Sequence, residues 1–206
     1  MELNTGLMQA AENGDVAGVR EHLAQAGQAN EYGRTALMAA AQGNHVECVR
    51  LLLDKEARMQ NRWGQTALVH ALSFGSAEAA LLLAPLEAEI NDRANVTPLM
   101  WAAHGGLSEC AELLLAGAGT QTLRPFSYTD FSAYASGVTA LMVAASRNCL
   151  PIIKLLRERE GELQDSDGHD ALWYARNNAL VFSNYALVRQ EEEHTEAVAL
   201  LTNKDQ

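Results

Sequence analysis

Several residue types are scarce in this chain of 206 residues, and each scarcity excludes a class of protein. The three cysteines, Cys48, Cys110 and Cys149, form no CxxC pair, which excludes the usual zinc and dithiol redox motifs. With only four prolines and 15 glycines, the chain is neither collagen-like nor a proline-rich linker. No apolar run approaches the ~18 residues of a membrane span, so we expect no membrane partner.

Positive charge is also scarce, because 15 Lys and Arg face 26 Asp and Glu, for a net charge of −11. Such a surface repels phosphate backbones, so we expect no nucleic-acid partner. The first residues carry an acid where a signal peptide would be basic, and the cysteines are widely spaced beside apolar residues. The acidic start argues against a secretory signal peptide, and the cysteine positions predict buried free thiols. Together they predict a reducing compartment, namely the cytoplasm, with the nucleus left open.

What the chain does contain is an internal repeat. A short motif occurs six times, as Thr5-Gly-Leu-Met, Thr35-Ala-Leu-Met, Thr66-Ala-Leu-Val, Thr97-Pro-Leu-Met, Thr139-Ala-Leu-Met and Asp170-Ala-Leu-Trp. The spacings are 30, 31, 31, 42 and 31 residues, so the long interval marks an insertion, residues 122–136. Fixed periods of ~20–50 residues are typical of stacked supersecondary units.

Each repeat has the pattern of two short helices. Nine residues after the motif start, five copies have glycine or asparagine, residue types that tolerate a left-handed backbone at a helix end: Gly14, Asn44, Gly75, Gly106 and Asn148. An apolar block such as Leu51-Leu-Leu follows, and an Asx residue then precedes Gly or Asn by three, which is turn chemistry. We therefore predict a helix, a tight turn, a second helix and a connection.

The combined pattern Asx-x-x-Gly-x-Thr-Ala/Pro-Leu-x-x-Ala-Ala, followed by the leucine block, resembles the ankyrin repeat. The resemblance implies an all-α, ankyrin-like helical repeat solenoid of about six helix-turn-helix units, joined by hairpin-like finger connections. It covers nearly the whole chain, and we expect one domain, 1–206. The expected repeats are 5–32, 33–63, 64–94, 95–121, 137–167 and 168–201, with a C-terminal cap insertion at about 180–193.

The sequence contains no common catalytic or metal-binding pattern. The six histidines fall at different repeat positions, and no nucleophile elbow, zinc-protease, P-loop or dinucleotide motif is present. The acidic run Asp165–Asp170 has its glycine fourth, whereas a calcium loop needs glycine sixth, so the repeat turn explains it better. We predict that the protein is not an enzyme and uses no cofactor or metal.

In an ankyrin-like stack the residues around each connection tip lie beside one another, on the concave side. The tip positions that we predict to contact a partner are Tyr32, Arg34, Arg62, Trp63, Gln65 and Arg93. Tyr32 and Trp63 occupy the same slot of adjacent copies, so they should stand side by side. Two compatible interpretations follow: the rings pack on each other, or they anchor a partner, as Tyr, Trp and Arg commonly do.

The insertion is a second candidate surface, because it is rich in aromatic residues. Phe126, Tyr128 and Phe131 are the predicted partner contacts there. A loop inserted between regular repeats commonly lies on the binding face. The alternative is that these rings fold back and fill the gap between the fourth and fifth repeats.

These observations predict a protein–protein interaction module that acts as scaffold, adaptor or regulatory subunit. The alternative is a dedicated inhibitor of a single enzyme, such as a kinase. A less favoured third hypothesis is a small-molecule sensor that uses the aromatic insertion as a lid. The partner is a protein of unknown identity, and we expect the chain to be a monomer on its own.

Overall fold

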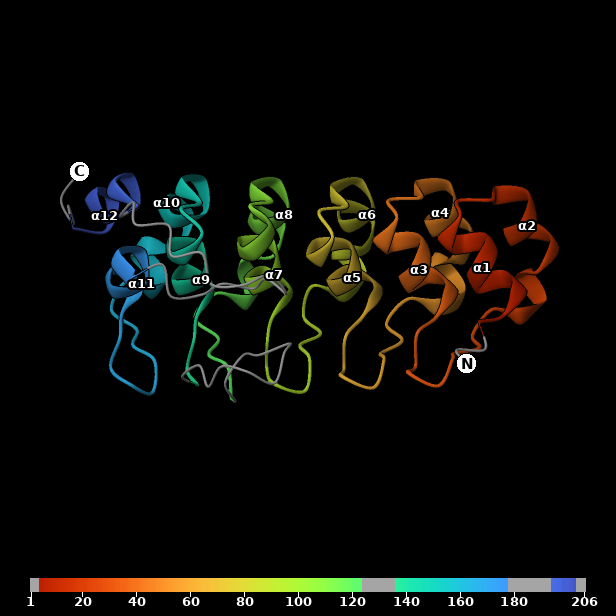
Figure 1. The fold of residues 1–206 in the computed structure, drawn as a ribbon, viewed down its shortest axis with the longest axis horizontal. Coiled ribbons are helices and arrows are strands. Elements are labelled where there is room, and N and C mark those ends of the chain that lie inside the picture. Colours follow the sequence, from red (N-terminus) through yellow and green to blue (C-terminus); the bar gives the residue numbers. More distant parts are fainter. Residues whose placement is uncertain (1–3, 124–135, 178–193, 203–206) are drawn as a thin grey trace. The chain divides into compact units, whose positions relative to one another are not determined.

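The computed structural model describes residues 4–123, 136–177 and 194–202. Two compact units, residues 1–93 and 94–206, are described separately. The first contains α1 (Gly6–Glu12), α2 (Val16–Glu21), the 3₁₀ helix η1 (Leu23–Gln25), α3 (Ala36–Gln42), α4 (Val46–Glu56), α5 (Ala67–Ser73) and α6 (Ala77–Glu87) (Figure 1). The second contains α7 (Pro98–Gly105), α8 (Ser108–Leu113), the 3₁₀ helix η2 (Leu115–Gly117), α9 (Ala140–Ser146), α10 (Leu150–Glu160), α11 (Ala171–Asn177) and α12 (Thr195–Thr202).

The prediction of an all-α helical repeat is confirmed. The described ranges contain helices and no strand, and the helices follow one another in the predicted pairs. Among the described residues no helix has the length and apolar character needed to cross a bilayer. The predicted C-terminal insertion, 180–193, lies outside the described residues.

The first helix of most repeats begins directly after the motif threonine. Oγ1 of Thr97 accepts a hydrogen bond from the Met100 amide at 3.2 Å, and Thr5, Thr35 and Thr139 make the same contact. A side-chain acceptor here satisfies an amide that has no partner within the helix. The recurring threonine therefore defines where each of these helices starts.

The residues predicted at the turn between paired helices adopt the left-handed conformation. The φ angle is +68° at Gly14, +54° at Asn44, +74° at Gly75, +68° at Gly106 and +53° at Asn148. Most side chains clash in this conformation, whereas glycine and, to a lesser degree, asparagine adopt it. The prediction is confirmed, and each turn folds the second helix back on the first.

The first helices form the buried layer of each unit. In the first unit α3 packs against α1 and α5, and in the second α9 packs against α7 and α11. Small residues such as Ala40 and Ala71 have no exposed surface, which lets neighbouring helices approach closely. The leucine of the motif is buried in five copies: Leu7, Leu37, Leu68, Leu99 and Leu141.

Three buried glutamates at the ends of second helices connect neighbouring repeats. Glu87 is 0% exposed, and its carboxylate accepts hydrogen bonds from the Leu68 amide at 2.7 Å and the Arg58 amide at 2.8 Å. The first donor opens the first helix of the same repeat, and the second lies in the connection of the preceding repeat. The same arrangement joins Glu56 to Leu37 and Gly27, and Glu160 to Leu141 and Gly119.

The prediction of buried free thiols holds for two of the three cysteines. All three are free, but only Cys48 and Cys110 are buried, and burial raises the pKa of both thiols. Cys149 directly precedes α10 and is only half-buried; its Sγ donates to the Ala103 carbonyl oxygen at 3.5 Å. Its pKa is also raised by burial, against the opposing effect of Arg147.

Candidate functional site

The connection before each first helix is a tight Asx turn, which we call a finger. In the first unit finger 1 is residues 30–34 and finger 2 is residues 61–65. Oδ1 of Asn61 accepts hydrogen bonds from the amides of Trp63 at 2.9 Å and Gln65 at 3.0 Å. Asn30 makes the equivalent pair in finger 1. The Asx chemistry predicted from the sequence therefore shapes both tips.

Backbone hydrogen bonds hold successive fingers in register. The Arg62 amide donates to the Tyr32 carbonyl at 2.9 Å, and the Arg93 amide donates to the Trp63 carbonyl at 3.1 Å. Gly64 has φ of +84°, and a Cβ added to it would lie only 2.8 Å from the Arg93 nitrogen. This close approach requires glycine, and it makes the tips of the first unit a preformed surface.

The two aromatic rings at the tips stack on each other, as predicted. The Tyr32 and Trp63 ring centroids lie 6.2 Å apart, with an angle of 10° between the ring planes. Stacking leaves both rings accessible, with Tyr32 37% and Trp63 52% exposed. Packing between fingers therefore covers part of each ring and leaves part of it exposed.

One arginine side chain lies beside this stack, and a second arginine, Arg93, is hydrogen-bonded to Trp63 through its backbone. The Arg62 guanidinium carbon is 5.9 Å from the centroid of the Tyr32 ring, within the range of a cation–π interaction. Arg62 and Arg93 are both exposed, and neither forms an ion pair with any residue that the structure describes. We call the four residues Tyr32, Arg62, Trp63 and Arg93 the tip surface.

The model for ankyrin repeats (3 copies) matches residues 7–94, 56–125 and 99–205, which together span almost the whole chain. The chain belongs to the ankyrin-repeat family. The Asx turns, the stacked helix pairs and the aligned fingers described above are the features of this family that the sequence motif predicts.

Many solved structures have a fold similar to that of this chain, and two of them cover nearly its whole length. One chain belongs to the complex of the predatory endopeptidase Bd0816 from Bdellovibrio bacteriovorus with immunity protein Bd3460 (23% identity, 98% of this chain and 99% of that chain, TM-score 0.70). The other is an ankyrin repeat domain from Acinetobacter baumannii (21% identity, 95% of each chain, TM-score 0.68). No curated protein sequence matches this chain significantly.

Two of the predicted contact residues in the ankyrin fingers face inward. Gln65 is only 4% exposed, and its Oε1 accepts a hydrogen bond from Nδ2 of Asn61 at 2.9 Å. Arg34 is half-buried, and its guanidinium donates to Glu12 at 3.3 Å and to Gln42 at 3.0 Å. The side chain of Gln65 is therefore engaged within its own finger, and that of Arg34 by its own unit.

The predicted contacts Phe126, Tyr128 and Phe131 in the insertion lie outside the described residues. At the ends of this segment, the Gly137 amide donates to the Thr122 carbonyl at 2.7 Å, and the Val138 amide donates to Thr122 Oγ1 at 3.1 Å. The described chain therefore leaves and re-enters the repeat at one place. Both interpretations of the insertion stay open.

A histidine on an inner helix, which the sequence did not single out, lies close to finger 2. Nε2 of His70 on α5 is 3.3 Å from Nδ2 of Asn61, so the ring nitrogen accepts from the amide group. Burial, together with the nearby positive charge of Arg34, lowers the pKa of His70 to about 4. The imidazole is therefore neutral at pH 7 and supports the finger by a hydrogen bond.

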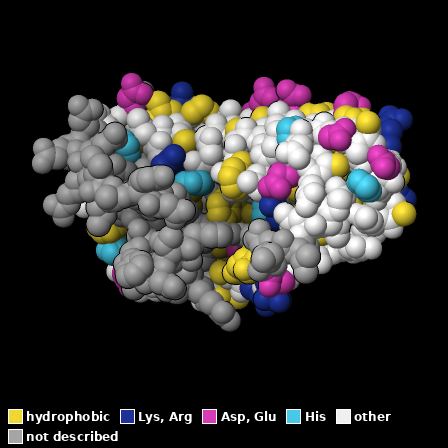
Figure 2. Space-filling model, turned by 45° about the vertical axis from the view of Figure 1, so that its right-hand side comes forward, with side chains coloured by type: hydrophobic (Ala, Val, Ile, Leu, Met, Phe, Trp, Pro, Cys, Tyr) yellow, Lys and Arg dark blue, Asp and Glu magenta, His cyan; other side chains and the backbone are white. Residues whose placement is uncertain are grey.

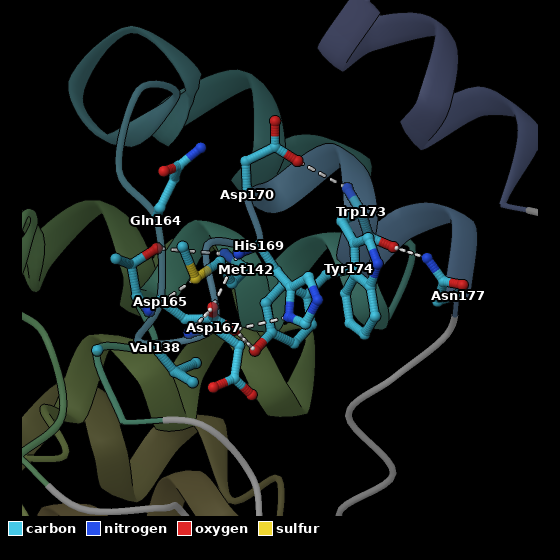
Figure 3. Close-up of polar contacts among 12 residues, drawn as sticks. Val138, Met142, Gln164, Asp165, Asp167, His169, Asp170, Trp173, Tyr174 and Asn177 are labelled. Carbon is cyan, nitrogen blue, oxygen red and sulfur yellow. Dashed lines mark hydrogen bonds and ion pairs between the residues drawn. The ribbon is translucent and has the colours of Figure 1, made fainter.

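The last ankyrin finger, in the second unit, is built around a buried aspartate (Figure 3). Oδ1 of Asp165 accepts from the amides of Asp167 and His169, both at 2.9 Å, and Oδ2 accepts from the Tyr174 hydroxyl at 2.6 Å. Burial acts to raise the pKa of Asp165, but these hydrogen bonds outweigh it and leave the pKa below its ordinary value. The His169 ring stacks on Trp173 with centroids 3.6 Å apart.

Every acceptor oxygen of Asp165 is therefore used to shape the finger, as the repeat-turn interpretation of this acidic run predicts. No group of three His, Cys, Asp or Glu that could hold a metal occurs among the residues that the structure describes. In the first unit, the tip surface presents two stacked aromatic rings that are both exposed to solvent.

Proposed function

We propose that this chain binds a protein partner and that the tip surface of Tyr32, Arg62, Trp63 and Arg93 is a main contact. One observation carries the proposal: two stacked aromatic rings remain 37% and 52% exposed at the tips of a rigid hydrogen-bonded ladder. Ankyrin repeats are interaction modules, and the family membership supports the same function.

The energetics favour a contact at Trp63. A tryptophan buries about 200 Å² when fully covered, so covering its exposed half removes about 100 Å² from water. At about 25 cal/mol per Å², this contributes about 2.5 kcal/mol to binding. Because the fingers are already ordered, association loses little conformational entropy at this site.

Capture from cell extract by purified wild-type and variant chains, quantified by mass spectrometry, tests the proposal. Trp63→Ala should reduce the recovery of specific partners by about tenfold or more, since about 1.4 kcal/mol corresponds to tenfold. Phe74→Ala is the matched control, because Phe74 is also a large exposed aromatic, 62% exposed, but lies at the end of α5 away from the fingers. Equal recovery with both variants would contradict the assignment of the tip surface.

A dedicated inhibitor of one enzyme is the second candidate. It is supported by the likeness of this fold to a chain in a complex of an endopeptidase with an immunity protein. An inhibitor should capture one enzyme in stoichiometric amount, and adding the purified chain should abolish the activity of that enzyme. A scaffold or adaptor should instead capture several proteins, none of which loses activity.

A further inference from the structure

We infer that the partner presents an acidic polypeptide segment to the tip surface, with carboxylates against Arg62 and Arg93. This inference rests on the proposed function and adds the chemistry of the partner. The net charge of −11 alone would favour a basic partner, so the inference depends on where the charges lie.

The first argument is the contrast among the arginines of the first unit. Arg34 is neutralised by Glu12 at 3.3 Å, and Arg50 by Glu47 at 3.6 Å. Arg58 donates to the Leu86 carbonyl at 3.0 Å. Arg20 on α2, and Arg62 and Arg93 at the fingers, are exposed and form no ion pair among the described residues. At the fingers, the guanidinium groups of Arg62 and Arg93 are therefore available to a carboxylate, which an arginine can bind with two parallel hydrogen bonds.

The second argument is the contact that Arg62 makes. Its guanidinium carbon lies over the Tyr32 ring, 5.9 Å from the centroid, and a cation–π contact uses none of the N–H donors. Arg62 therefore keeps its hydrogen-bonding capacity for a carboxylate. A carboxylate bound there would lie near the exposed Trp63, so the segment should carry acidic residues next to apolar ones.

The third argument is the local charge at the fingers. The second helices of the first unit carry exposed charges of both signs: the acids Glu21, Glu47, Asp54 and Glu78 and the bases Arg20, Arg50 and Lys55. Acidic and basic side chains are both visible along the upper edge in Figure 2. Because charges separated by more than about 8 Å are largely screened at physiological ionic strength, the local arginines decide what binds at the tips.

Finger 1 gives the segment a direction. Glu31 occupies in finger 1 the slot that Arg62 occupies in finger 2, and it is exposed. A carboxylate beside Glu31 would be repelled, so the acids of the segment should lie toward Arg93 and its other end should be neutral or basic.

Selection of short random peptides displayed on phage, with the whole chain as bait, tests the inference. Wild-type selections should be enriched in Asp and Glu beside apolar residues. The double variant Arg62→Glu/Arg93→Glu should instead enrich Lys and Arg, and should bind a synthetic wild-type-selected peptide about tenfold more weakly by fluorescence anisotropy. The control Arg20→Glu/Arg50→Glu makes the same change in net charge on the second helices and should leave the selected composition unchanged.

The outcomes separate this inference from the function on which it rests. Peptides that need Trp63 but are neutral or basic would overturn the acidic segment and leave the tip surface intact. If no selected peptide loses binding in Trp63→Ala, both proposals fail. Light scattering that shows a wild-type dimer dissociated by Arg62→Glu/Arg93→Glu would also overturn the inference, because a second copy would then occupy the surface.

Discussion

Removing the Glu87 carboxylate should destabilise the protein although no partner or active site is involved. In Glu87→Ala the Leu68 amide loses its 2.7 Å hydrogen bond at a position with no exposed surface, and an unsatisfied buried amide costs about 1–3 kcal/mol. The Arg58 amide also loses its acceptor, but Arg58 is exposed and water can replace it. The lost side-chain volume adds about 1 kcal/mol, and relief of the buried charge offsets part of the total.

We therefore expect a net loss of about 2–3 kcal/mol for Glu87→Ala. Urea unfolding followed by circular dichroism measures it, and the midpoint should fall by about 1 M at a typical slope of about 2 kcal/mol per M. Glu78→Ala is the matched control, because Glu78 lies on the same helix and is exposed. If both variants unfold at the same urea concentration, the carboxylate does not connect the repeats and the reasoning is refuted.

Three other changes test the packing and the electrostatics. Leu99→Ala should cost about 2–5 kcal/mol in urea unfolding, because Leu99 has no exposed surface and its loss opens a cavity; a loss below about 0.5 kcal/mol would contradict the repeat register. Gly64→Ala should lower the free energy of unfolding by about 1 kcal/mol or more beyond the effect of Gly75→Ala. Both glycines have positive φ, but only a Cβ added at position 64 would meet backbone, 2.8 Å from the Arg93 nitrogen. Equal urea midpoints for the two variants would refute this. Burial raises the pKa of Glu160 despite hydrogen bonds from Gly119, Leu141 and Thr139, so the folded state binds the proton more tightly than the unfolded state. The stability of wild type relative to Glu160→Gln should therefore increase as the pH falls from 7 toward the unfolded pKa of about 4.3, and a constant difference in urea unfolding would contradict the shift.

The repeat explains why much of the fold could be predicted from one sequence. Equivalent positions in the six copies occupy the same place in each repeat, so the left-handed turn residues and the pairing of Tyr32 with Trp63 follow from alignment of the chain with itself. Such an alignment does not give the direction of individual polar side chains. Gln65 and Arg34 flank the tips in sequence, but their contacts with Asn61 and Glu12 turn them inward.

The sequence contains a regular spacing that marks the three buried glutamates. Glu56, Glu87 and Glu160 each lie 21 residues after their motif threonine, but a charged residue near the end of an amphipathic helix is ordinarily solvated. The fourth repeat has Ala118 at this position, which weakens the pattern. Their role depends on amide donors from two repeats, and this is tertiary information that helical periodicity does not contain.

Site-specific photo-crosslinking tests the central claim most directly. The photoreactive amino acid p-benzoylphenylalanine is placed at position 63 in one sample and at position 74 in another, so an aromatic ring replaces an exposed aromatic ring in both. If the tip surface binds the partner, irradiation in cell extract should join a protein to position 63 and not to position 74. Crosslinking at position 74 alone, or equally at both positions, would contradict the account.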